Sequence, residues 1–168
     1  MNVSSKQILA IISAAALVVI LVYPALATGG VTIRLGSSAI EKAEHVYATI
    51  GVVWVHHSGQ SDGEGWEVAL NQSRSVDLVS LASTPIELGT GQIALGSYDR
   101  VRVEISNVTW VFNQTTTTLQ LQSSEVQSSF EFTAQSGRAV VAVLTVAGYQ
   151  QEIGGVNFFV PTLSSARG

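Results

Sequence analysis

The 168-residue chain contains 8 Lys and Arg against 12 Asp and Glu, so its formal net charge is −4 at pH 7, and it contains no Cys. The acidic balance argues against nucleic acid as a partner, and the absence of Cys excludes a disulfide framework and thiolate metal sites. Only 12% of the residues are charged, about half the usual fraction. The polar surface must therefore come mostly from Ser, Thr, Gln and Asn, which suits an exported protein.

The N-terminal segment has the layout of a secretory signal peptide. Lys6 precedes an apolar run over residues 8–23, and small residues close this run at 25–27. A basic start, an apolar centre and a small-residue end are the three parts of such a leader. We predict export by the general secretory route, with membrane contact only through the leader before cleavage.

The predicted cleavage site lies between Ala27 and Thr28. It divides the chain into a signal peptide at 1–27 and one domain at 28–168. The remaining 141 residues (168 minus 27) form a typical single-domain length that can bury a core.

The first segment after this site is predicted to be a short strand, at about residues 29–36. Apolar and polar side chains alternate along it, and glycines lie at both ends. Nothing local forces such a strand to pair within its own chain, so it could complete the sheet of a neighbouring molecule. The predicted donor residues are Gly30, Val31, Thr32, Ile33, Arg34 and Leu35.

The rest of the chain predicts an all-β fold, an antiparallel β-sandwich of the Ig-like or jelly-roll-like kind. Short runs rich in β-branched and aromatic residues are separated by Gly- and Ser-rich turns. Residues 40–45 are the most helix-like stretch, of a turn or two, and 58–65 predict a mobile hairpin loop. Strands are expected at 46–55, 66–70, 98–106, 108–112, 116–122, 128–134, 140–146 and 157–160, the last one ending before Pro161.

Three of the four Asn residues after the leader begin Asn-x-Ser/Thr sequons, at Asn71, Asn107 and Asn113. Such sequons accept N-glycans on the surface of exported proteins. We predict N-glycosylation at all three, with Asn107 at a strand end and Asn113 on a loop.

No pattern indicates an enzyme, a metal site or a cofactor. The His56–His57 pair lies near two acids, but adjacent strand residues point to opposite faces, so polar residues at a strand end are the favoured interpretation. No nucleophile elbow or phosphate-binding loop is present. The charges at Asp99, Arg100, Arg102 and Glu104 could form a cross-strand set, but a solvated strand face is the favoured interpretation.

The three Trp residues leave two interpretations open. Trp54, Trp66 and Trp110 could stack on sugars in a carbohydrate-binding surface, but Trp next to Val more often packs in a core. The uncharged run from Thr115 to Ser124 is a second surface feature. As a sheet edge it would invite pairing with another chain.

Two segments carry a resemblance that covers roughly residues 31–106. They are Val76-Asp77-Leu78-Val79-Ser80-Leu81 and Leu95-Gly96-Ser97-Tyr98-Asp99-Arg100-Val101-Arg102-Val103. The chain resembles a family of secreted archaeal and bacterial β-sandwich domains of uncharacterised function. That family includes subunits of archaeal bundling pili and threads and is similar in architecture to TasA-type biofilm fibre proteins. The resemblance implies a scaffold whose first strand, here residues 30–35, completes the sandwich of the next subunit.

The leading hypothesis is a structural subunit of an extracellular filament, a homopolymer with N-glycans that serves surface adhesion or biofilm cohesion. Two alternatives stay open. A type IV pilin-like subunit would retain the apolar helix at residues 8–23, and a secreted or membrane-tethered module would bind glycans through its Trp residues. No enzyme activity, metal or cofactor is expected in any of the three cases.

Overall fold

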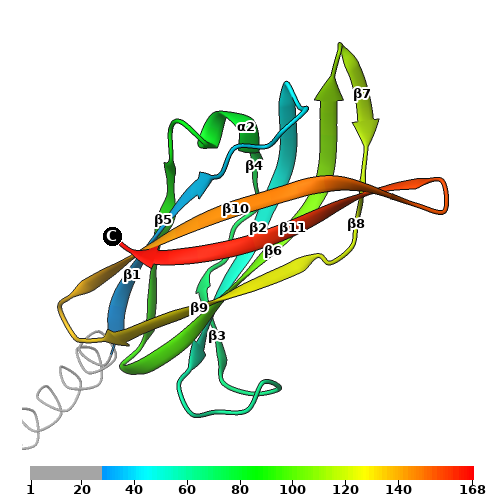
Figure 1. Cartoon of the computed structure of the whole chain (residues 1–168). Coiled ribbons are helices and arrows are strands. Elements are labelled where there is room, and N and C mark those ends of the chain that lie inside the picture. The colour runs from blue at the N-terminus through cyan, green and yellow to red at the C-terminus, as the bar shows by residue number, and fades with distance from the viewer. Residues whose placement is uncertain (1–27) are drawn as a thin grey trace, which may run out of the picture.

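The computed structural model describes residues 28–168, which form an all-β sandwich of two packed sheets (Figure 1). The predicted signal peptide and the Ala27 side of the cleavage site lie outside the described residues. Within 28–168, no helix has the length and apolar character that crossing a membrane requires.

The first sheet, sheet A, has five strands in the order β5-β1-β10-β11-β8. Two neighbouring pairs are antiparallel, β5 with β1 and β10 with β11, whereas β1 runs parallel to β10 and β11 runs parallel to β8. The bounds are β1 (Thr28–Ser37), β5 (Ile86–Ala94), β8 (Gln120–Leu121), β10 (Ala139–Ile153) and β11 (Val156–Arg167).

The second sheet, sheet B, is antiparallel, with the order β3-β2-β6-β7. Two further strands join it, because β4 pairs with β2 and β9 pairs with β6. The bounds are β2 (His45–His57), β3 (Trp66–Leu70), β4 (Arg74–Asp77), β6 (Gly96–Phe112), β7 (Thr115–Thr118) and β9 (Glu125–Ala134), with the single turn α2 (Leu78–Leu81) after β4.

The core lies between the facing surfaces of the two sheets, and the alternation in the sequence decides which residues enter it. In β1 and the first half of β10, every second residue is buried. Long strands with this period of two bury one face and leave the other to solvent. Ile33, Leu144, Ile105 and Phe159 are among the fully buried side chains.

Four expectations about individual elements were wrong. The strand expected at 116–122 is two short strands in different sheets, β7 in sheet B and β8 in sheet A. Residues 40–45 form no helix. Instead, a turn with Lys42 at φ 57° leads into β2. The Trp110 indole donates a hydrogen bond to the Lys42 carbonyl oxygen at 3.2 Å. The strands expected at 98–106 and 108–112 are one strand, β6. Its pairing with β2 shifts register opposite Ala48, and Asn107 has a left-handed backbone conformation there. Strand β11 also continues through Pro161, which is tolerated because β10 is its only neighbour there.

The β10–β11 hairpin is longer than the sheet that carries it. Strand β1 ends opposite Val146, so β10 has only β11 as a partner from Ala147 onward. The two strands turn at Gly154 and Gly155, whose φ angles are 60° and 82°. This segment, residues 147–157, projects from the body of the sandwich (Figure 1), and we call it the arm.

Candidate functional site

Strand β1 contains all six predicted donor residues and lies inside sheet A. It pairs with β10 over residues 30–37 and with β5 over residues 28–35. The side chains of Val31, Ile33 and Leu35 are fully buried, whereas Arg34 is exposed. In this structure the strand therefore completes the sheet of its own chain.

Two glycines let the start of β1 approach its neighbours closely. A Cβ atom added at Gly29 would lie 3.1 Å from the backbone of Gln135, and one added at Gly30 would lie 3.2 Å from the Cβ of Ala139. Larger residues would push β1 away from the β9–β10 turn. On the outer face of the sheet, the hydroxyls of Thr32 and Thr90 lie 2.8 Å apart and tie β1 to β5.

The slot that β1 fills has hydrogen-bonding strands on both sides. Because β5 and β10 each bond to β1 and not to one another, a sandwich without β1 would expose two open strand edges and part of its core. Only the segment 38–44 joins the end of β1 to the other sheet. This slot, lined by β5 and β10, could not be read from local sequence patterns, since its two sides lie about fifty residues apart in the chain.

The three sequon asparagines are all exposed. Asn71 lies in the loop between β3 and β4, and Asn113 lies in the two-residue turn between β6 and β7, as expected of a loop position. The prediction of a strand end was wrong for Asn107, which lies within β6 at its register shift. Both Asn107 and Asn113 have positive φ, at 51° and 48°, a conformation in which Asn is enriched for steric reasons.

His56 lies at the end of β2, as expected, on the outer face of sheet B, and it is fully buried there. Its Nδ1 lies 2.8 Å from Asp99 Oδ1, and its Nε2 lies 3.1 Å from the carbonyl oxygen of Ser61. The Arg100 guanidinium packs against the ring, with Nη2 3.0 Å from each ring nitrogen. With both nitrogens engaged, the imidazole fastens the 58–65 loop to β6.

The neighbouring charges are paired and do not form the solvated face that the alternation predicts. Arg100 bonds to Asp62 and Asp99, and Arg102 bonds to Glu125 at 2.8 Å. Desolvation would raise the pKa of Asp99, but hydrogen bonds from His56 and Arg100 outweigh it and hold this pKa below its ordinary value. The hydrogen bond to Asp62, together with its charge, raises the pKa of Arg100.

The Trp residues have two different environments. Trp110 is buried, as core packing predicts, whereas Trp54 and Trp66 are half-buried on the outer face of sheet B. The guanidinium carbon of Arg102 lies 3.8 Å from the centre of the Trp66 ring and 5.9 Å from that of Trp54. Because Arg102 already covers a Trp66 face, a sugar could stack on that face only after displacing it.

His57 has partners of its own, separate from those of His56. Its Nε2 lies 3.2 Å from Glu67 Oε2, and the hydroxyl of Tyr98 donates to the same carboxylate oxygen at 2.6 Å. Burial, together with the bond to Glu67 and the charge of that group, raises the pKa of Tyr98 well above its ordinary value of 10.0. Among residues 28–168, no group of three or more His, Cys, Asp or Glu side chains is placed to hold a metal ion.

Comparison with known proteins identifies the family. No curated protein and no solved structure matches the chain. A family model described as "Domain of unknown function (DUF4382)" matches residues 28–147. The match begins at the first residue of β1 and ends within β10, at the base of the arm. The chain therefore belongs to the DUF4382 family.

Proposed function

We propose that the protein is a structural subunit of an extracellular filament and that it polymerises by placing β1 in the sheet of the next subunit. One observation carries this proposal. The strand that begins the domain has a fully buried apolar face, is hydrogen-bonded on both edges, and is joined to the rest of the domain at one end by a short segment. Such a strand is the element that one chain can give to another.

The free energy of burial favours a slot that is filled by a β1 strand, whichever chain supplies that strand. Burying side chains of the size of Val31, Ile33 and Leu35 stabilises a fold by about 1.5–3 kcal/mol each. The same contacts and the same backbone hydrogen bonds form whether β1 comes from its own chain or from a neighbour. Exchange therefore costs little beyond the entropy of association and the extension of the segment 38–44.

The linking segment limits the geometry of exchange. Residues 38–44 can span at most roughly 23 Å when fully extended, at about 3.3 Å per residue. The start of β2 in one subunit must therefore lie within that distance of the slot in the next. Because a donated strand and a receiving slot are different surfaces, the contact is heterologous and can continue without closing.

The exposed sequons and the uncharged strand edge fit an extracellular polymer. Asn71, Asn107 and Asn113 can carry N-glycans without disturbing the core. Within the described residues, β7 is one of the two end strands of the path β3-β2-β6-β7, and it contains four Thr residues and no charge. We infer that this edge supports lateral contacts between filaments in adhesion or biofilm cohesion.

The decisive experiment is disulfide trapping in material from native cells, since the chain contains no Cys. Two variants are expressed together, one with Thr32→Cys and the other with Thr90→Cys. The two positions are direct partners across β1 and β5, so oxidation joins two chains only if β1 of one lies in the sheet of the other. We expect covalent dimers from the mixture and a ladder of multimers from the double variant.

A matched pair within sheet B serves as the control. Ser97 and Thr133 are partners across β6 and β9, with their hydroxyls 3.5 Å apart. The double variant Ser97→Cys/Thr133→Cys should form its disulfide within one chain in all material. If the Thr32/Thr90 pair behaves in the same way, with no bond between chains, β1 stays in its own sheet and the proposal is wrong.

A further inference from the structure

The arm exposes apolar surface that its own sandwich does not cover. Of the seven large apolar side chains that are most exposed among residues 28–168, three lie on the arm: Tyr149, Ile153 and Val156. The arm has a single charge, Glu152, which is exposed and forms no ion pair within 28–168. A single unpaired acid on an exposed tip is suited to pair with a basic surface.

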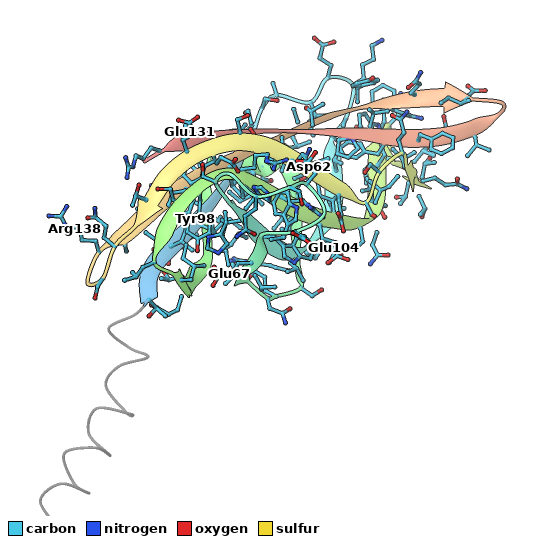
Figure 2. All side chains as sticks on the ribbon, turned by 90° about the horizontal axis from the view of Figure 1, so that it is seen from below. Asp62, Glu67, Tyr98, Glu104, Glu131 and Arg138 are labelled. Carbon is cyan, nitrogen blue, oxygen red and sulfur yellow. The ribbon has the colours of Figure 1, made fainter. Side chains whose placement is uncertain are left out.

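A mainly polar groove with two arginines lies at the other end of the same two strands. A groove of about 810 Å³ is lined by Arg138 at the start of β10, Arg167 at the end of β11, and Glu131 of β9, with Phe132 and Val140 among its apolar residues. Both arginines are exposed, and neither forms an ion pair with another residue of 28–168. Figure 2 shows Arg138 at the end of the molecule opposite the arm.

We propose that the arm of one molecule docks in this groove of a second copy, with Glu152 between Arg138 and Arg167. The side chains that line the groove have two positive charges and one negative charge, from Glu131, so their net charge is positive. The 28–168 domain is otherwise acidic, with 7 Lys and Arg against 12 Asp and Glu. Two free arginines at one end therefore distinguish this surface from the rest and select an acidic partner.

The placement of arm and groove makes the contact head-to-tail. Residues 138 and 152 are separated by fourteen strand positions, or roughly 46 Å at about 3.3 Å per residue. The arm therefore cannot fold back into the groove of its own chain. Because the two surfaces lie at opposite ends of β10 and β11, each docking event leaves a free arm and a free groove, and the chain of contacts continues along the strand direction.

This inference rests on the proposed function in one respect, namely that the protein forms a polymer. The residues of the arm and the groove lie outside β1, so the two contacts can be tested separately. The test reverses the charges of the arm and the groove in protein collected from the cells that export it. Sedimentation velocity and electron microscopy measure the assembly. Glu152→Arg should weaken association roughly tenfold or more, as should the pair Arg138→Glu/Arg167→Glu. The triple variant, which exchanges the charges of arm and groove, should restore assembly.

A matched control is Glu64→Arg, which makes the same charge change at an exposed residue that belongs to neither the arm nor the lining of the groove. It should assemble as the parent does. Loss of assembly in both reversed variants without rescue in the triple variant would show that the arm docks elsewhere. Unchanged assembly in both would also overturn the inference.

Thr32/Thr90 trapping in the same backgrounds separates this inference from the proposed function. Trapped dimers together with unchanged assembly in the arm variants would leave β1 exchange standing and remove the arm contact. A charge-dependent assembly without any trapping would leave the arm contact standing and remove β1 exchange.

Discussion

The Nδ1 atom of His56 lies 2.8 Å from Oδ1 of Asp99, joining β2 to β6 through an imidazole that is fully buried. The other ring nitrogen lies 3.1 Å from the carbonyl oxygen of Ser61 in the 58–65 loop. One side chain thus holds two strands and a loop together. This explains why the outer face of sheet B is ordered around polar groups at this end.

Replacing His56 should therefore be costly. His56→Leu puts an apolar side chain of moderate size at this position and removes both hydrogen bonds, so we expect the free energy of unfolding to fall by about 3 kcal/mol. Urea denaturation followed by Trp fluorescence measures this change, because Trp66 lies 4.9 Å from the His56 ring. His45→Leu is the control: His45 pairs with Asp77, but its side chain is 48% exposed, and the loss should not exceed about 1 kcal/mol. Equal losses would contradict the structural role of His56.

Acid should destabilise the fold through Asp77 and Asp99. Burial would raise the pKa of Asp77, but bonds from Ser80, His45 and the backbone of Val46 and Val79 outweigh it and lower the pKa below 3.8. The pKa of Asp99 is lowered as well. A carboxyl with a lowered folded-state pKa contributes stability that is fully present above its unfolded pKa and is lost as pH falls through the folded value.

We therefore expect urea midpoints to hold from pH 7 to about pH 5 and to fall below about pH 4. Asp77→Asn should be less stable at pH 7, because the carboxylate caps α2 and also accepts from Val46 N. Its midpoint should then change less between pH 5 and pH 3 than that of the parent. A variant as acid-sensitive as the parent would show that this carboxyl is not a source of the pH dependence.

Gly91 marks the place where β3 approaches β5. A Cβ atom at this position would overlap the carbonyl oxygen of Ala69, a backbone atom that cannot swing aside. Gly91→Ala should therefore cost about 2–3 kcal/mol of stability, because β3 must move away from β5. Gly63→Ala is the matched control, since no atom lies within 4 Å of its added Cβ, and its effect should stay within about 0.5 kcal/mol. Thermal unfolding of the two variants compares them directly, and a Gly91→Ala variant as stable as Gly63→Ala would contradict the packing.

Glycosylation at Asn107 can be separated from its backbone role. Thr109→Val removes the sequon and leaves the left-handed Asn107 in place, so the protein from native cells should lose the mass of one glycan and keep its stability. Asn107→Ala should lose the same mass and also about 1–2 kcal/mol, because Ala is disfavoured at φ 51°. Intact-mass spectrometry and thermal unfolding provide the two readouts. An unchanged mass in Thr109→Val would remove this glycan from the proposal.

Much of the strand pattern was predictable, because it depends on neighbours in sequence. Alternation predicts the strands at 31–35 and 98–106, and the structure confirms both within β1 and β6. The same local reasoning divided β6 at Asn107 and ended β11 at Pro161. Both errors have one cause: a strand continues through an unfavourable residue when its neighbours hold it on either side of that residue.

By itself, the sequence determined the fold class, the sequons and the alternating apolar face of β1, since each depends on residue type and short-range spacing. Tertiary structure alone decided that β1 lies between β5 and β10, that His56 is buried beside Asp99, and that Arg138 and Arg167 line the same groove. These relationships join segments far apart in the chain. Register, strand order and packing between the sheets fix them, and no local pattern encodes a partner fifty or a hundred residues away.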